Sequence, residues 1–299
     1  MLSSIPGISK LFYILAITIC VSVSGYAQSG KIDSLLKKIE ANPADFEAVS
    51  ALSTIFLEQE NFESAESLLD AYLKTDSLNS QAFYLFGHVL DLTGKIPNAM
   101  EYYKKAAMLD SLNWRAYRDL GYLYDIFSAY DSMNFVMSKA VSFSPEPEKL
   151  YYDYGYSFDM LGQLDSAMIY YRHSIEYDSL DHHALLNLGA ILATGGDYDS
   201  AKYYSEKSLA INPDSPQGCY NMGEVSFSMG DYEYAASYFQ KVLAIDPSIF
   251  AAKKRMGDTL EILGDSAMAK IYFQDFLDSA PQFYKDDIAE VEEKIKQYK

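Results

Sequence analysis

The feature that most constrains this chain is a spacing of 34 residues between glycines. Six glycines follow one another at this interval with no insertion: Gly87, Gly121, Gly155, Gly189, Gly223 and Gly257. A second glycine column lies seven residues further on, at Gly94, Gly162, Gly196, Gly230 and Gly264. A strict period of this length is typical of stacked repeats, in which each unit buries its apolar face against its neighbours. The sequence therefore predicts a linear stack of similar units.

Two further columns fix the limits of the repeat. Alanine recurs at the same interval at 65, 99, 167, 201, 235 and 269, and proline at 43, 145, 213, 247 and 281. With these columns in register, seven repeats cover residues 46–283. We expect them to begin at residues 46, 80, 114, 148, 182, 216 and 250.

Each repeat has the pattern of two helices joined by a tight turn. In the second repeat, apolar residues recur at helical spacing over Gln81–Leu92 and again over Asn98–Leu109. Between them lies Gly94, which can adopt the positive φ that closes a helix. The glycine of the first column has a different role, because it lies where the two helices of a repeat cross and a side chain would separate them.

These residues resemble the tetratricopeptide repeat family. The third repeat shows the family pattern of an aromatic residue, Leu-Gly, an aromatic residue, Ala and Pro, at Tyr117, Leu120-Gly121, Tyr124, Ala140 and Pro145. The resemblance implies an all-α fold, a right-handed α-solenoid of seven 34-residue helical hairpins. Ser53, Glu60 and Ser128 depart from the glycine columns, and the geometry of their turns is left open.

The segments on either side of the repeats have the pattern of single helices. Residues 28–45 contain Ile32, Leu35 and Ile39 on one helical face, and residues 284–299 contain Ile288 and Val291 among charged residues. A solenoid needs such amphipathic helices to cover its last apolar surfaces. We therefore expect an extra capping helix at each end.

Residues 1–27 have the pattern of a secretory signal peptide. Lys10 precedes an apolar run over residues 11–23, and Gly25 and Ala27 provide the small residues of a cleavage site. The alternative of a membrane anchor is disfavoured, because the run is too short for a bilayer core of about 30 Å. We expect an exported bacterial protein, periplasmic or secreted, that does not span the membrane after signal cleavage.

The overall charge excludes one class of partner. Acidic residues outnumber basic residues 42 to 24, a formal net charge of −18. Because nucleic-acid backbones require clustered Lys and Arg, we expect no nucleic-acid partner. Two cysteines, Cys20 and Cys219, are too few for a disulfide scaffold, and Cys219 falls in an apolar column where a buried, unreactive thiol is expected.

No motif indicates catalysis, a cofactor or a metal. His182 and His183 are adjacent, so on a helix their side chains point about 100° apart and cannot easily bind one ion. The Asp-Tyr-Asp-Ser segment at 197–200 lacks the remaining ligands of a calcium loop and is better explained as a helix N-cap. A hydrolase using His88 and Asp91 would need a nucleophile that the sequence does not display. We expect no enzyme activity and no cofactor.

The resemblance implies a ligand groove lined by the first helix of each repeat. At the family's inward positions, six residues of repeats four to six predict a peptide-binding site: Tyr152, Tyr156, Asn187, Tyr220, Asn221 and Phe227. Aromatic anchors with a few polar groups are typical of binding hot spots. The competing explanation is that tyrosine is abundant, with 27 residues, and packs between repeats.

Over all of the family's inward positions, acidic residues outnumber basic ones. We expect Arg115 and Arg118 to pair with Asp91, Asp119 or Asp125 across repeats.

Two functions remain open at this point. The first is a non-enzymatic scaffold of the bacterial cell envelope that binds a protein or peptide in its groove. The second is a structural subunit of a permanent envelope assembly that contacts partners through its convex face or ends. Asn221 and Arg255 match two positions of the family's carboxylate clamp, but Leu186 and Ala190 occupy others, so a clamp for a peptide carboxylate is not supported.

Overall fold

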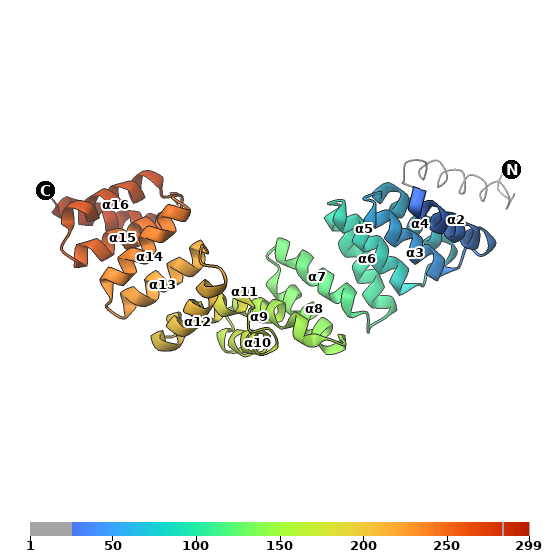
Figure 1. Cartoon of the computed structure of the whole chain (residues 1–299), viewed down its shortest axis with the longest axis horizontal. Helices are drawn as coiled ribbons and strands as arrows, with labels where there is room; N and C mark the ends of the chain where they lie inside the picture. The colour runs from blue at the N-terminus through green and yellow to red at the C-terminus, as the bar shows by residue number, and fades with distance from the viewer. Residues whose placement is uncertain (1–25, 283, 299) are drawn as a thin grey trace. The chain divides into compact units, whose positions relative to one another are not determined.

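The computed structural model describes residues 26–282 and 284–298, and all regular structure among them is helical (Figure 1). This confirms the predicted all-α fold. Of the expected signal peptide, residues 1–25 lie outside the described residues. No helix in the described part is both long and apolar enough to cross a membrane.

The described helices divide into two compact units, with the boundary in the chain between Pro147 and Glu148. Unit 1 contains α2 (Tyr26–Ala41), α3 (Phe46–Glu58), α4 (Phe62–Thr75), α5 (Ser80–Leu92), α6 (Ile96–Leu109), α7 (Trp114–Ile126) and α8 (Tyr130–Phe143). Unit 2 contains α9 (Tyr151–Met160), α10 (Leu164–Tyr177), α11 (His182–Thr194), α12 (Tyr198–Ile211), α13 (Pro216–Ser228), α14 (Tyr232–Ile245), α15 (Phe250–Ile262), α16 (Ser266–Ser279) and α17 (Lys285–Gln297). A short 3-10 helix, Pro147–Leu150, precedes α9.

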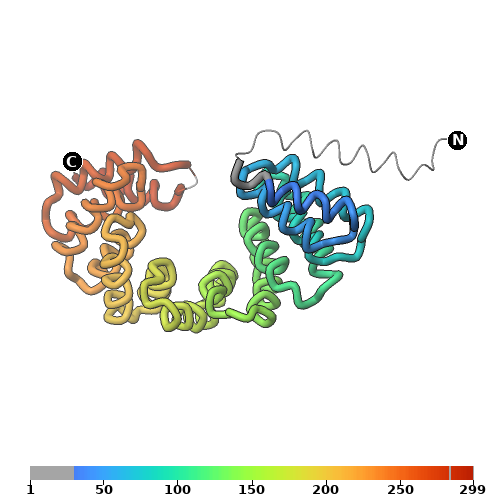
Figure 2. The backbone as a smooth tube through the Cα atoms, turned by 45° about the vertical axis from the view of Figure 1, so that its right-hand side comes forward, coloured from blue at the N-terminus to red at the C-terminus, as the bar shows by residue number. Residues whose placement is uncertain are grey.

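Helices α3 to α16 form seven hairpins, and within each unit every hairpin packs on the next (Figure 2). We call the first helix of a hairpin A and the second B. The A helices α3 and α5 contact each other in unit 1, as do α11 and α13 in unit 2. The A helices therefore form the inner layer of each unit, and the B helices form the outer layer.

The first glycine column lies where the A and B helices of one hairpin cross. A Cβ atom on Gly223 would lie 2.5 Å from Cε1 of Phe239, and one on Gly87 would lie 2.7 Å from Cδ1 of Tyr103. Both rings are fully buried. The absence of a side chain on the A helix thus lets a large ring of the B helix reach the helix crossing.

The second column closes the turn between the two helices with a left-handed residue. The five glycines of this column have φ between 70° and 84°. In the first and third repeats Glu60 and Ser128 take the same conformation, with φ of 54° and 52°. The turn geometry is therefore kept where the glycine is missing, at the steric cost that L residues incur in this region.

The two flanking helices cover the ends of the described stack. Ile32, Leu35 and Ile39 of α2 belong to the core of unit 1. At the other end Val291 of α17 is fully buried against Phe273 and Phe276 of α16. Both helices use the apolar faces that the sequence predicted.

Substitutions in the first glycine column test the helix crossing. Alanine at Gly223 must displace the buried ring of Phe239, and we expect a loss of about 1–2 kcal/mol in unfolding free energy, after the roughly 1 kcal/mol gain in helix propensity. At Gly121 the neighbour is the flexible thioether of Met137, so Gly121→Ala is expected to be close to neutral. Urea denaturation followed by circular dichroism measures the unfolding free energy of both variants. Equal losses would show that the buried ring does not depend on the absence of a Cβ atom at the crossing.

The non-glycine turns provide a second test. Ser128→Gly removes the left-handed strain and is expected to raise the unfolding free energy by about 0.5–1 kcal/mol. The matched reverse change, Gly94→Ser, is expected to lower it by a similar amount, although a Cβ there meets no atom within 4 Å. Thermal melts of the two variants have opposite expected signs. A destabilised Ser128→Gly variant would contradict this account of the turn.

Candidate functional site

The six residues predicted to bind a peptide all lie on A helices of unit 2. Tyr152 and Tyr156 are on α9, Asn187 is on α11, and Tyr220, Asn221 and Phe227 are on α13. The structure places them in two groups, one around Tyr152 and one around Tyr220. The groups differ in whether they contain a positive charge.

The first group consists of two stacked tyrosine rings and a chain of hydrogen bonds that includes Asn187. The rings of Tyr152 and Tyr156 lie 6.3 Å apart and within 18° of parallel. The Asn187 amide donates to the Tyr171 hydroxyl (3.1 Å), which in turn donates to Asp159 (3.1 Å). Tyr171 is fully buried on α10 and was not among the predicted site residues.

Burial changes the acidity of these groups. It raises the pKa of Tyr152 to about 12, with smaller contributions from the charges of Asp153 and Asp181, while a hydrogen bond with Asn187 acts in the opposite direction. Burial also raises the pKa of the Asp159 carboxyl above its ordinary value, although the hydrogen bond from Tyr171 opposes this shift. The Asp159 carboxylate therefore lies in a partly desolvated position where a counter-charge would be favourable.

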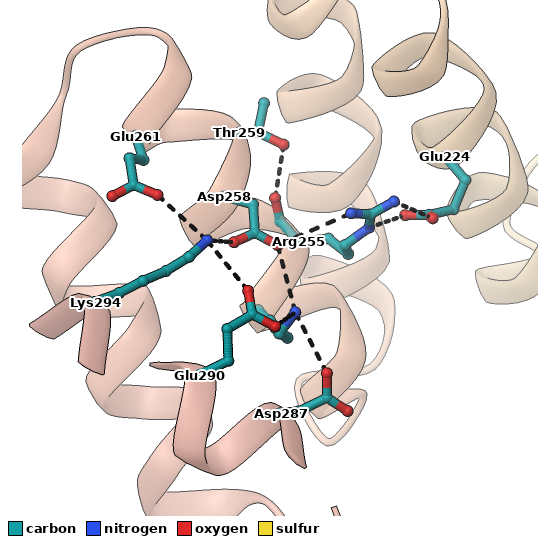
Figure 3. A network of polar contacts seen from close by, with 9 residues as sticks. Glu224, Arg255, Asp258, Thr259, Glu261, Asp287, Glu290 and Lys294 are labelled. Carbon is teal, nitrogen blue, oxygen red and sulfur yellow. Dashed lines mark hydrogen bonds and ion pairs between the residues drawn. The ribbon is translucent and has the colours of Figure 1, made fainter. Parts of the chain in front are cut away.

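The second group is built around an arginine. The Arg255 guanidinium on α15 donates two hydrogen bonds to Glu224, both of 2.5 Å (Figure 3). It lies 4.5 Å from the centre of the Phe227 ring. It also hydrogen-bonds with Tyr220, whose pKa burial raises to about 12. A bidentate pair of this kind holds both side chains in one orientation.

Asn221 is not available as a ligand contact. Its side chain is buried, its carboxamide oxygen accepts from Gln217 (2.9 Å) and its nitrogen donates to the Leu186 carbonyl of α11 (3.5 Å). The expectation that this carboxamide faces a peptide is therefore corrected. Asn221 joins neighbouring A helices, because the polar group of a buried side chain must find its partner inside the protein.

A network of charges joins the last hairpin to α17. Figure 3 shows Lys294 of α17 paired with Asp258 (2.6 Å), Glu261 (3.3 Å) and Glu290 (3.4 Å). Lys254 also pairs with Glu290 (3.0 Å). The central carboxylate of the network, Asp258, is buried. The inner face of the last repeat is thus occupied by the chain's own helix.

The inner face of unit 1 holds a comparable cluster. Arg118 donates to Asp119 (2.6 Å), which hydrogen-bonds with Tyr84, and the guanidinium groups of Arg115 and Arg118 lie over the Trp114 ring at 4.7 and 5.5 Å. Of the three expected carboxylates, Asp119 is the partner of Arg118, but the expectation that the pair joins two repeats is wrong, because Asp119 is the next residue of the same helix. For Arg115 the described contact is with Trp114.

The remaining candidates have structural roles. Cys219 is a fully buried free thiol whose pKa burial raises, as expected for an unreactive cysteine. Asp197 caps α12 by accepting the Ser200 amide (3.2 Å), which agrees with the N-cap interpretation. His182 contacts the Ser208 hydroxyl (2.7 Å), and the described residues hold no cluster of three or more potential metal ligands.

Comparison with known families settles the relationship. Models of the tetratricopeptide repeat match residues 50–113, 148–179, 182–215 and 216–249, which is more than half of the chain. The chain belongs to the tetratricopeptide repeat family. No curated protein sequence is a significant match.

Solved tetratricopeptide repeat structures share its fold. YrrB, a TPR protein with an unusual peptide-binding site, is 23% identical, with a TM-score of 0.56 over 62% of this chain and 95% of its own. PilW, a type IV pilus biogenesis factor, is 19% identical, with a TM-score of 0.59 over 71% of this chain and 97% of its own. A tetratricopeptide repeat protein from Parabacteroides merdae is 18% identical, with a TM-score of 0.57 over 84% of this chain and 97% of its own.

The charge network of this tetratricopeptide repeat chain gives a stability prediction. Asp258→Asn removes the buried counter-charge of Lys294 and is expected to lower the unfolding free energy of unit 2 by about 2 kcal/mol or more. The control is Glu293→Gln, which breaks the exposed pair of Glu293 with Lys296 in the same unit and is expected to change it by less than about 0.5 kcal/mol. Urea unfolding of both variants measures the difference, and equal effects would contradict a stabilising role for the network.

Proposed function

We propose that this protein is a non-enzymatic scaffold of the bacterial cell envelope that binds a protein or peptide on the inner face of unit 2. One observation carries the proposal. Tyr152, Tyr156 and Phe227 are only partly buried on A helices, although Tyr171 and Phe239 already fill the helix crossings beneath them. The partly buried rings therefore pack against the core from the inner layer and keep part of their surface exposed.

The composition of this face suits an extended peptide. Between the two aromatic groups, α11 carries uncharged side chains, of which Ala190 and Ala193 are partly buried and Leu186 is buried. An apolar ligand side chain placed there displaces no charged group from water, so its burial is not opposed by a large desolvation cost. Rigid rings on either side offer contact area with few rotatable bonds to order.

The comparisons support the same class of function. YrrB is named for a peptide-binding site and PilW for pilus biogenesis, and both share the fold of this chain. The envelope location rests on the signal-peptide pattern of residues 1–27. The acidic balance of the chain supports a protein partner over a nucleic acid.

The two residues that would have to act in a hydrolase, His88 and Asp91, contact tyrosine side chains. The His88 ring stacks on Tyr84, and Asp91 accepts the buried Tyr103 hydroxyl (3.4 Å). Neither group approaches a nucleophile among the contacts described for them. We therefore propose that binding, and not turnover, is the function of the inner face.

A second function is favoured by a groove in unit 1. A concavity of about 740 Å³ lies between the outer helices α6 and α8, with Met108 and Phe135 on its rims. These two side chains are 84% and 61% exposed. Exposed apolar groups on the outer layer suit a structural subunit that contacts its assembly through the convex face.

Site-specific photocrosslinking in native cells separates the two functions. A photoreactive residue at Tyr156 reports on the inner face of unit 2, and one at Phe135 reports on the outer groove of unit 1. The proposed function predicts a crosslinked protein at Tyr156, lost in a Tyr220→Ala, Phe227→Ala variant that keeps its helical signal. Crosslinks confined to Phe135, in a stoichiometric complex that survives high salt, would favour the structural subunit.

A further inference from the structure

Three repeats carry the same arrangement of residues on the inner face, which we call the tyrosine box. Each has a tyrosine at the fifth residue of the repeat: Tyr84, Tyr152 and Tyr220. Each tyrosine packs on the ring of the B helix that fills the glycine crossing, with ring centres 5.7, 5.8 and 5.7 Å apart. The repeated distance shows that the boxes are equivalent sites in the register of the fold.

Each box also contains a carboxylate further along the same A helix. Asp91 in the first box and Asp159 in the second are the twelfth residue of their repeats, whereas the carboxylate of the third box, Glu224, is the ninth residue of its repeat. The A helix of the next repeat supplies the last side chain, and here the boxes differ.

In two of the boxes that side chain is an arginine. In the third box Arg255 pairs with Glu224, hydrogen-bonds with Tyr220 and covers the Phe227 ring. In the first box Arg118 pairs with Asp119, which is bonded to Tyr84, while Asp91 accepts the Tyr103 hydroxyl. A guanidinium between rings and carboxylates is therefore the arrangement that this chain itself adopts, and it combines ion pairing with cation–π contact.

The box of Tyr152 lacks the arginine. The following helix places Leu186 and Asn187 at the positions that Arg118 and Arg255 occupy in the other two boxes. Asn187 is neutral and bonds to Tyr171. In the part of the chain that the structure describes, no cation pairs with Asp159, whose printed contact is the Tyr171 hydroxyl. The stacked rings of Tyr152 and Tyr156 lie on the same helix as this carboxylate, and Tyr152 packs on Tyr171, whose hydroxyl bonds to it.

We propose that the box formed by Tyr152, Tyr156, Asp159 and Asn187 binds a basic side chain, an arginine before a lysine, from an extended segment of the partner protein. The partner's guanidinium takes the place that the chain fills for itself in the other two boxes. Arginine is favoured because its planar group stacks on a ring while it donates to a carboxylate, whereas the lysine ammonium is a point charge. This inference rests on the proposed function, since it names the residue that the inner face of unit 2 recognises.

A peptide selection tests the inference. A random peptide display library is selected against the intact protein, and the enriched peptides are resynthesised with arginine, citrulline or glutamate at each enriched basic position. We expect one basic position shared by the enriched peptides, and about a tenfold loss of affinity when citrulline replaces arginine there. The loss is expected to shrink as salt is raised, because salt screens the ion pair.

Two matched variants locate the effect. Asp159→Asn keeps an oxygen for the Tyr171 hydroxyl and is expected to fold normally, as a thermal melt checks, while it abolishes the difference between arginine and citrulline. Asp91→Asn changes the equivalent carboxylate of the first box and is expected to leave that difference intact. A preference for arginine that persists in Asp159→Asn would overturn the proposed site.

The outcomes separate this inference from the proposed function. Peptides that lose binding in Tyr156→Ala but contain no preferred basic residue would overturn the basic anchor and leave the groove function standing. If no selected peptide responds to Tyr156→Ala, the proposed function fails, and the inference fails with it.

Discussion

The close crossing of the A and B helices in each hairpin is the contact on which the other features depend. Because Gly223 and its equivalents have no Cβ atom, a buried ring such as Phe239 can lie directly against the A helix. The ring then forms the floor under the tyrosine one turn earlier, at a distance that is nearly the same in three repeats. The inner face is thus shaped by a packing requirement before any ligand is considered.

Charge is distributed over this face in a way that composition alone does not show. The chain is strongly acidic, yet most inner carboxylates in the last two repeats are paired with cations from the next helix along, including Lys294 of α17. This pairing closes the end of unit 2 and reduces repulsion between carboxylates at the surface. Asp159, in the fourth repeat, accepts the Tyr171 hydroxyl, as Asp91 in the second repeat accepts the Tyr103 hydroxyl, and none of its described contacts is with a cation.

The period of the sequence was sufficient to predict the fold. The glycine and alanine columns reflect how closely two helices approach and where a turn closes, so they predicted the hairpins and the left-handed turns. The apolar column that contains Cys219 predicted the burial of its thiol. Glu60 and Ser128 show that a turn can keep its shape without its glycine, because the stack around it fixes the backbone. Such local substitutions do not disturb a register that six other repeats define.

The partners of the polar side chains could not be predicted in the same way. The register places Asn221 and Arg118 on the inner layer, but it does not determine the rotamer that decides which neighbour each one bonds. The Asn221 carboxamide donates to the Leu186 carbonyl, and Arg118 donates to Asp119. Tyr171 was missed as a site residue because its buried hydroxyl connects two A-helix residues from the layer beneath.

The central claim is that the box around Asp159 is an empty version of a site that the chain fills elsewhere. An NMR titration with acetyl-arginine-amide, and with its citrulline analogue as the control, tests this claim most directly. The account predicts that the largest arginine-specific amide shifts fall in α9 and α11, around Tyr156, Asp159 and Asn187, and that the boxes holding Arg118 and Arg255 stay unchanged. Equal shifts with citrulline, or arginine-specific shifts confined to other helices, would contradict it.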